Sequence, residues 1–155
     1  MGDDLTYIPA QRSGATRNRL TTLQKAESLR KLPLFSETSI EDLYRLAAVA
    51  HEIEFAAGRV IYQKEDIGDA FYLIVQGRIE CDTEGGGKPV IAGPGEAAGL
   101  YSVLTREARE TSAKAFEDTF ALAVGAEDFY NLLSCNAEIT VGLIKYFVKK
   151  AGITL

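Results

Sequence analysis

GPGEAAGLYSVLTREARETSAKA, residues 93–115, is the stretch of sequence on which the interpretation of this chain depends. Within it, residues 100–105 are predicted to form one or two helical turns that begin directly after Gly99. The N–H groups at a helix start have no partner within the helix and lie at the positive end of the peptide dipoles, so they attract anions. Arg109 follows, and a planar guanidinium can hold an anion with two parallel hydrogen bonds. The stretch is a candidate phosphate cradle, although a Gly-rich loop with Arg109 as a solvated surface charge fits the same spacing.

Short apolar or alternating runs, separated by turn signals at regular spacing, flank the cradle on both sides. We expect strands at 51–55, 59–63, 70–76, 78–82 and 88–92 before it, and at 111–117 and 119–125 after it. Three glycines, 85–87, mark a hairpin tip between two of them. The total is about eight strands, which is enough to close a jelly roll.

Helical patterns precede and follow the strands. The first runs over 20–32 and stops at Pro33, and the second follows Ser39, whose side chain can cap it while Asp42 returns the bond. Two more are predicted after residue 125, the last one capped by Asn136. The predicted fold class is α+β, mainly β: an eight-stranded antiparallel jelly roll, or β-roll, flanked by two N-terminal and two C-terminal helices.

The last predicted helix carries an apolar stripe. Its members recur at helical spacing: Ile139, Leu143, Ile144, Phe147 and Ala151. Three interpretations stay open for this stripe, namely packing against the barrel, a lid over a pocket, and a face for self-association. The second helix has the same ambiguity between a core-packing helix and a partner-binding one.

Composition excludes several classes of function. With 155 residues and a net charge of −5, the chain is expected to form one domain and not to bind nucleic acid through a general positive field. The single histidine, His51, and two distant cysteines, Cys81 and Cys135, offer no converging ligand set, so we expect no metal site. Unpaired cysteines are typical of a reduced, cytoplasmic protein.

The ends of the chain are expected to lie outside the domain. Residues 1–19 are polar and unpatterned, which favours a disordered leader or linker; 20–151 form the domain and 152–155 a tail. No apolar run is long enough to span a bilayer, and no signal peptide is recognisable. A leader of this kind raises the prospect that the chain is a fragment of a larger protein.

In this order, the helices, the β-roll and the cradle resemble the cyclic-nucleotide-binding domain family, whose roll is of the catabolite-activator type. The resemblance covers about 20–151 and depends on a series of landmarks: Leu34, Phe35, Phe55, Gly58, Ile61, Gly68, Asp69, Tyr72, Leu73, Ile74, Gly77, Gly95, Gly99, Arg109, Glu117, Asp118 and Thr119. Residues 20–35 also look like the version of this domain that is attached to transporters or helical-repeat proteins.

The resemblance implies that the cradle is the family's phosphate-binding cassette. There the short helix and the arginine hold the cyclic phosphate, and a glutamate after the second glycine holds the ribose 2′-hydroxyl. By position, Gly99 is that glycine, Ser102 offers a backbone N–H to the phosphate, and Arg109 is the arginine. Thr111 and Ser112 continue into a strand that lines the base pocket. The predicted ligand-binding residues are Gly99, Leu100, Tyr101, Ser102, Arg109, Glu110 and Thr111, with no catalytic residue.

Two positions depart from the family pattern, and both lower the expected affinity. Leu100 stands where the ribose glutamate belongs, and a hydrogen bond to a charged group contributes about 1.5–3 kcal/mol. Glu110 stands where a small hydroxyl residue is usual, and a carboxylate about 5 Å from a phosphate costs about 3 kcal/mol at an effective dielectric constant near 20. Glu110 can avoid this by pointing outward, or it can pair with Arg106 or Arg109 and spoil the anion site.

A buried arginine needs an acidic partner, so we expect one against Arg109. The candidates are a phosphate, a buffer ion, or one of Glu96, Glu107 and Glu110. The direction in which the guanidinium points decides between the two interpretations of the cradle.

Two functions follow from the resemblance. The first is a regulatory signalling domain that senses cyclic AMP or cyclic GMP with weakened affinity. The second is a degenerate, ligand-free interaction or dimerisation module of a larger transporter or helical-repeat protein, with a pocket filled by Leu100 and Tyr101 and a homodimer or host domain docked on the last helix. Neither is an enzyme, and neither needs a cofactor beyond the cyclic nucleotide or small anion.

Overall fold

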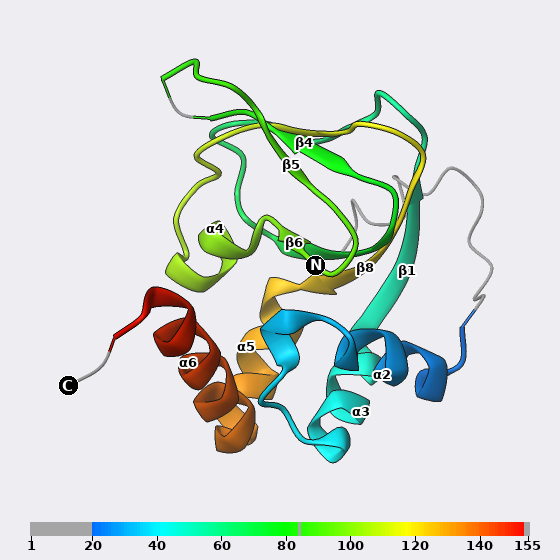
Figure 1. The fold of residues 1–155 in the computed structure, drawn as a ribbon, viewed down its shortest axis with the longest axis vertical. Coiled ribbons are helices and arrows are strands. Elements are labelled where there is room, and N and C mark those ends of the chain that lie inside the picture. Colours follow the sequence, from blue (N-terminus) through cyan, green and yellow to red (C-terminus); the bar gives the residue numbers. More distant parts are fainter. Residues whose placement is uncertain (1–19, 84, 154–155) are drawn as a thin grey trace.

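The computed structural model describes residues 20–83 and 85–153. The predicted leader at 1–19 and the last two residues of the predicted tail lie outside this part of the chain. Two four-stranded antiparallel sheets form a β-roll, and the helices α2, α3, α5 and α6 gather on one side of it (Figure 1). The predicted fold class is therefore confirmed.

The first sheet has the order β1-β8-β3-β6 and the second the order β2-β7-β4-β5. The strands, in chain order, are β1 (Ala50–Phe55), β2 (Val60–Tyr62), β3 (Ala70–Gln76), β4 (Ile79–Cys81), β5 (Val90–Ala92), β6 (Ala97–Ala98), β7 (Ala113–Ala115) and β8 (Thr119–Gly125). Seven of them lie within or next to the predicted runs. The two-residue strand β6 was missed, because two alanines between glycines carry no alternating pattern.

Strands β3 and β8 are buried on both faces, which explains why their sequences are nearly continuous apolar runs. Phe71 and Leu73 of β3 join a core cluster shared with the helices, whereas Tyr72 and Ile74 point into the roll. Successive side chains of a strand point to opposite faces of the sheet, so β3 and β8 lie between two separate cores and contribute side chains to both. The interior of the roll is thus closed off from the helical layer.

The N-terminal helices are α2 (Thr22–Arg30), a short 3₁₀ helix η2 (Pro33–Phe35) and α3 (Ile40–Val49). Thr21 and Gln24 form a reciprocal capping box at α2, which was not predicted. At α3 the Ser39 hydroxyl accepts a hydrogen bond from the Asp42 N–H, as predicted. The Asp42 side chain pairs with Arg45 at 2.8 Å, so the expected return bond to Ser39 was wrong.

The C-terminal helices are α5 (Ala126–Cys135) and α6 (Ala137–Ala151). Asn136 is the N-cap residue of α6, as predicted, but its side chain donates to the Leu132 carbonyl at the end of α5 and makes no capping bond to α6. The predicted stripe of α6 is divided: Ile139 and Leu143 are buried, but Ile144 and Phe147 are exposed. Among the described residues, no helix is both long and apolar enough to cross a bilayer.

Candidate functional site

Helix α4 (Leu100–Thr105) begins directly after Gly99, as the sequence predicted. Gly99 has φ +85°, a conformation that glycine adopts without strain. A Cβ atom at this position would lie 2.6 Å from Nη1 of Arg109. Both the turn and the close approach of the guanidinium therefore require glycine here.

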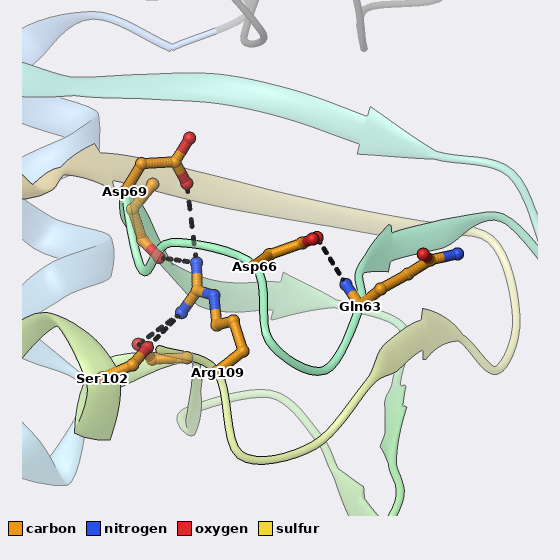
Figure 2. A network of polar contacts seen from close by, with 7 residues as sticks. Gln63, Asp66, Asp69, Ser102 and Arg109 are labelled. Atoms are coloured by element: carbon orange, nitrogen blue, oxygen red, sulfur yellow. Dashed lines mark hydrogen bonds and ion pairs between the residues drawn. The ribbon is translucent and has the colours of Figure 1, made fainter. Parts of the chain in front are cut away.

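Arg109 is 3% exposed, so it is a buried residue and no solvated surface charge. Its Nη1 donates to the Gly99 carbonyl and to the Ser102 hydroxyl, both at 2.8 Å, and its Nη2 donates to the Ala70 carbonyl at 2.6 Å (Figure 2). Hydrogen bonds to a buried cation lower the cost of its desolvation. The guanidinium is fixed between the start of α4 and the start of β3.

Among the described residues, the carboxylate that pairs with Arg109 is that of Asp69, whose Oδ1 lies 3.7 Å from Nη2. The predicted partners Glu96, Glu107 and Glu110 were wrong, since none of them pairs with it. Burial raises the pKa of Asp69 above its usual value, and the positive charge of Arg109 opposes that rise. Asp69 is thus a loose, half-exposed counter-ion.

One face of the Arg109 guanidinium has a neighbour, whereas its Nε has no hydrogen-bond partner in the described part of the chain. Its Cζ lies 4.0 Å from the centre of the Tyr62 ring, which covers one face of the group. Its Nε is buried and has no hydrogen-bond partner among the described residues. A buried N–H without an acceptor is unfavourable, so Nε is the part of the guanidinium that the described residues leave unsatisfied.

The backbone of Arg109 is fixed as firmly as its side chain. Its N–H donates to the Asp66 carbonyl at 2.8 Å, and its carbonyl accepts from the Glu65 N–H at 2.9 Å. The Asp66 side chain in turn accepts from the N–H of Gln63 at 2.9 Å (Figure 2). The backbone N–H and carbonyl of Arg109 therefore both bond to the loop between β2 and β3.

An open hollow of about 260 Å³ lies beside Arg109. All seven predicted ligand-binding residues line it: Gly99, Leu100, Tyr101, Ser102, Arg109, Glu110 and Thr111. Tyr62 and Ala97 complete the lining. The side chain of Leu100 packs against the helical core cluster, and Tyr101 is 54% exposed. The expectation that these two side chains fill the pocket was therefore wrong.

Glu110 lies at the border of this hollow and is exposed. Among the described ion pairs, none joins it to Arg106 or Arg109. Arg106 instead stacks on the ring of Tyr130, with its Cζ 3.8 Å from the ring centre. The carboxylate of Glu110 therefore leaves Arg109 unblocked, although its charge stays close to the hollow.

Sequence reasoning missed three contributors to the site: Tyr62, Asp69 and Ala70. Asp69 was noted only as a landmark beside Gly68, and a carbonyl such as that of Ala70 has no sequence signal because every residue carries one. Ser102 also makes a contact that was not predicted, since its hydroxyl accepts a hydrogen bond from Nη1 of Arg109.

The remaining candidate residues lie elsewhere. His51 is exposed on β1, Cys81 is partly buried against the core of the roll, and Cys135 is exposed. Among the described residues, no group of three or more His, Cys, Asp or Glu side chains could hold a metal ion.

Known proteins share this fold and these segments. The family profile described as cyclic nucleotide-binding domain matches residues 52–136, more than half of the chain. The Cyclic AMP receptor protein of Thermus thermophilus is 32% identical over 105 residues, which are 65% of this chain and 49% of that protein. A cAMP-dependent protein kinase regulatory subunit of Emericella nidulans is 31% identical over 106 residues, 68% of this chain and 26% of the relative.

The likeness extends to solved structures. The crystal structure of the Thermus thermophilus catabolite activator protein superposes with a TM-score of 0.65 at 28% identity, and covers 77% of this chain and 58% of that one. The chain spans about half of the first curated relative, named a cyclic AMP receptor protein, and about a quarter of the second, named a regulatory subunit. From the matched profile, the shared roll and the buried arginine after the Gly-flanked helix, the chain belongs to the cyclic nucleotide-binding domain family.

Proposed function

We propose that this domain senses a cyclic nucleotide, whose phosphate binds beside Arg109, and passes the signal to a larger protein. The observation that supports the proposal best is the buried guanidinium: it lines an open hollow and keeps one N–H without an acceptor. A phosphate oxygen would supply that acceptor and a negative charge. The relatives' names, a cyclic AMP receptor and a regulatory subunit of a cAMP-dependent kinase, favour the same ligand class.

Weak binding is part of this proposal. Leu100 offers no hydrogen bond to a ribose hydroxyl, because its side chain is apolar and packs against the helical core. The exposed carboxylate of Glu110 adds a negative charge at the edge of the hollow. Together they lower the affinity for cyclic AMP or cyclic GMP by roughly one to three orders of magnitude.

Calorimetric titration with cyclic AMP and cyclic GMP, up to millimolar concentration, tests the proposal directly. We expect saturable heat and a rise in the thermal midpoint with ligand concentration. The matched controls are Arg109→Lys, which keeps the charge but loses Nε, and Arg78→Lys on the exposed surface. Absence of both heat and thermal shift in the wild-type domain would remove the sensing function.

Leu100→Glu tests the reason for the weak affinity. Leu100 lines the hollow as well as packing against the helical core, so a carboxylate at this position can accept a hydrogen bond from a ribose 2′-hydroxyl, and we expect cyclic AMP to bind about ten- to a hundredfold tighter. The 2′-deoxy analogue of cyclic AMP is the control ligand and should gain nothing. Equal gains for both ligands would show that position 100 does not face the ribose.

A second candidate function, an interaction module, is favoured by one specific observation on α6. Val141, Ile144 and Val148 recur at spacings of three and four residues and are 47%, 55% and 38% exposed. Such a stripe is the seam by which two helices pair. Sedimentation velocity of the wild-type domain and of Ile144→Glu tests this function: concentration-dependent association that the variant abolishes supports it, and a monomer at all concentrations rejects self-association.

We infer a cytoplasmic setting for either function. Both cysteines of the described chain, Cys81 and Cys135, are present as free thiols, which is typical of a reducing compartment. Thiol titration of the protein isolated from its native host under acid quench checks this inference.

A further inference from the structure

We propose that the hydroxyl of Ser102 positions Arg109, so that an anion in the hollow is bound through the Nε side of the guanidinium. The proposal rests on the proposed function for the identity of the anion, a phosphate-type ligand. It differs from the role expected from sequence, in which Ser102 contributes only a backbone N–H. Here the serine side chain acts on the arginine and not on the ligand.

The contact between the two side chains is short and shielded from water. The Ser102 Oγ accepts a hydrogen bond from Nη1 at 2.8 Å, and Ser102 and Arg109 are 4% and 3% exposed. The same hydroxyl lies 3.5 Å from the Gly99 carbonyl, to which it donates. A charge-assisted hydrogen bond at this depth has little competition from water, so it restricts the rotation of the guanidinium.

Gly68 fixes the serine from the opposite side. A Cβ atom at Gly68 would overlap both Oγ and Cβ of Ser102. The loop before β3 therefore lies directly on the serine side chain and leaves no room for another rotamer on that side. Gly68 contacts Ser102, and Ser102 contacts Arg109, so the loop before β3, helix α4 and the loop between α4 and β7 are held together.

The second terminal nitrogen is occupied in the same way. Nη2 donates to the Ala70 carbonyl at 2.6 Å, and the Tyr62 ring covers one face of the group. Both terminal nitrogens are thus directed at protein oxygens, and Nε alone is buried without an acceptor (Figure 2). Nε is itself buried, so its missing acceptor, and not its exposure, makes it the nitrogen to which an anion oxygen can bond without displacing a protein partner.

Side-chain NMR of the ¹⁵N-labelled domain tests the positioning role without any ligand. The Arg109 Nε–H signal is assigned by its absence in Arg109→Lys. In Ser102→Ala we expect rotation about the guanidinium C–N bonds to become roughly tenfold faster, because one charged hydrogen bond is lost. Thr105→Ala is the matched control: it removes a hydroxyl from the same helix, one that bonds to the Tyr101 carbonyl and not to Arg109.

Ligand binding gives the second readout. We expect cyclic AMP to bind Ser102→Ala about tenfold more weakly than the wild type. In the wild type, cyclic AMP or inorganic phosphate should shift the Nε–H resonance. Ser102→Cys keeps a side chain of the same shape, somewhat larger, and replaces the oxygen by a weak acceptor, so we expect the faster rotation in this variant as well, even if the alanine variant folds poorly.

The outcomes separate this inference from the proposed function. If cyclic AMP fails to bind any form while the serine variants loosen the guanidinium, the proposed ligand is wrong and the positioning role stands. Unchanged rotation in both Ser102→Ala and Ser102→Cys overturns the positioning role, whatever the ligand does. An unshifted Nε–H resonance in a saturated wild-type complex overturns the Nε binding mode.

Discussion

Arg109 and Arg78 have similar neighbours but different surroundings. Each lies over an aromatic ring, Tyr62 at 4.0 Å and Phe116 at 4.7 Å, and each has a carboxylate nearby. Arg78 pairs with Glu117 at 2.9 Å, with the two side chains 48% and 44% exposed. Arg109 has a more distant carboxylate, yet it is buried and bound to three protein oxygens.

Burial, and not the set of neighbouring groups, makes an arginine a candidate site. Water competes for every contact of Arg78, so its ion pair adds little to stability or recognition. Water is excluded from Arg109, so each of its hydrogen bonds contributes to stability. Its Nε lacks an acceptor, which a bound anion can supply. Four experiments test this difference between the buried and the exposed arginine.

Arg109→Ala should have the largest effect. It leaves the carbonyls of Gly99 and Ala70 and the hydroxyl of Ser102 without their donor, and removing one partner of a buried charged network costs about 3–5 kcal/mol. Urea denaturation measures the loss of unfolding free energy. A loss below about 1 kcal/mol would mean that water reaches these oxygens and that the burial argument is wrong.

Gly99→Ala should come second, at about 1–3 kcal/mol. The new Cβ meets Nη1 of Arg109 at 2.6 Å and adds strain at φ +85°. Gly58→Ala is the matched control, since Gly58 has φ +86° and nothing within 4 Å of a Cβ. The difference between the two variants isolates the contact with the arginine; equal losses would show that only backbone strain is involved.

The carboxylates beside the two arginines should give pH dependences of opposite sign. Burial raises the pKa of Asp69 when the chain folds, so its contribution to stability is present below its unfolded pKa and is lost as the pH rises through the folded pKa. The hydrogen bond from Arg78 lowers the pKa of Glu117, so that contribution is present above the unfolded pKa and is lost as the pH falls through the folded one.

Denaturation from about pH 3 to pH 7, a range that brackets the ordinary pKa values of Asp and Glu, checks both signs. Relative to the wild type, Asp69→Asn should gain stability as the pH rises, and Glu117→Gln should lose it. The same sign for both variants would contradict the assigned causes.

Arg78→Ala should have the smallest effect. Its ion pair with Glu117 is open to solvent, so the thermal midpoint should shift by no more than the experimental error at physiological salt. At high salt the shift in the thermal midpoint should be no larger than at physiological salt. A drop as large as that of Arg109→Ala would refute the role assigned to burial.

Much of the fold could be predicted from the sequence, because the signals are local. Helix α4 begins after Gly99, where a positive φ stops the preceding strand, and Ser39 caps α3 through its own hydroxyl. Non-local choices failed. The stripe on α6 was expected to face one way, but the neighbouring 3₁₀ helix and α5 cover only Ile139 and Leu143 and leave Ile144 exposed.

The candidate site was predicted only in part, for a comparable reason. Arg109 was identified through its spacing from Gly99, whereas the ring of Tyr62 and the carbonyl of Ala70 reach it from strands about 40 residues earlier in the chain. No local pattern reports which carbonyl a distant arginine will meet. The predicted acidic partners failed because nearness in sequence was taken for nearness in space.

The order of helices and strands, the turn at Gly99 and the position of Arg109 after a short helix can all be read from the residues alone. These depend on periodicity and on the φ angles that glycine permits, which act over a few residues. Only the tertiary structure decided that Arg109 points inward, that Ser102, Gly99 and Ala70 hold its terminal nitrogens, and that Nε is left without an acceptor. The physical reason is that burial and hydrogen-bond satisfaction depend on segments that meet only when the roll closes.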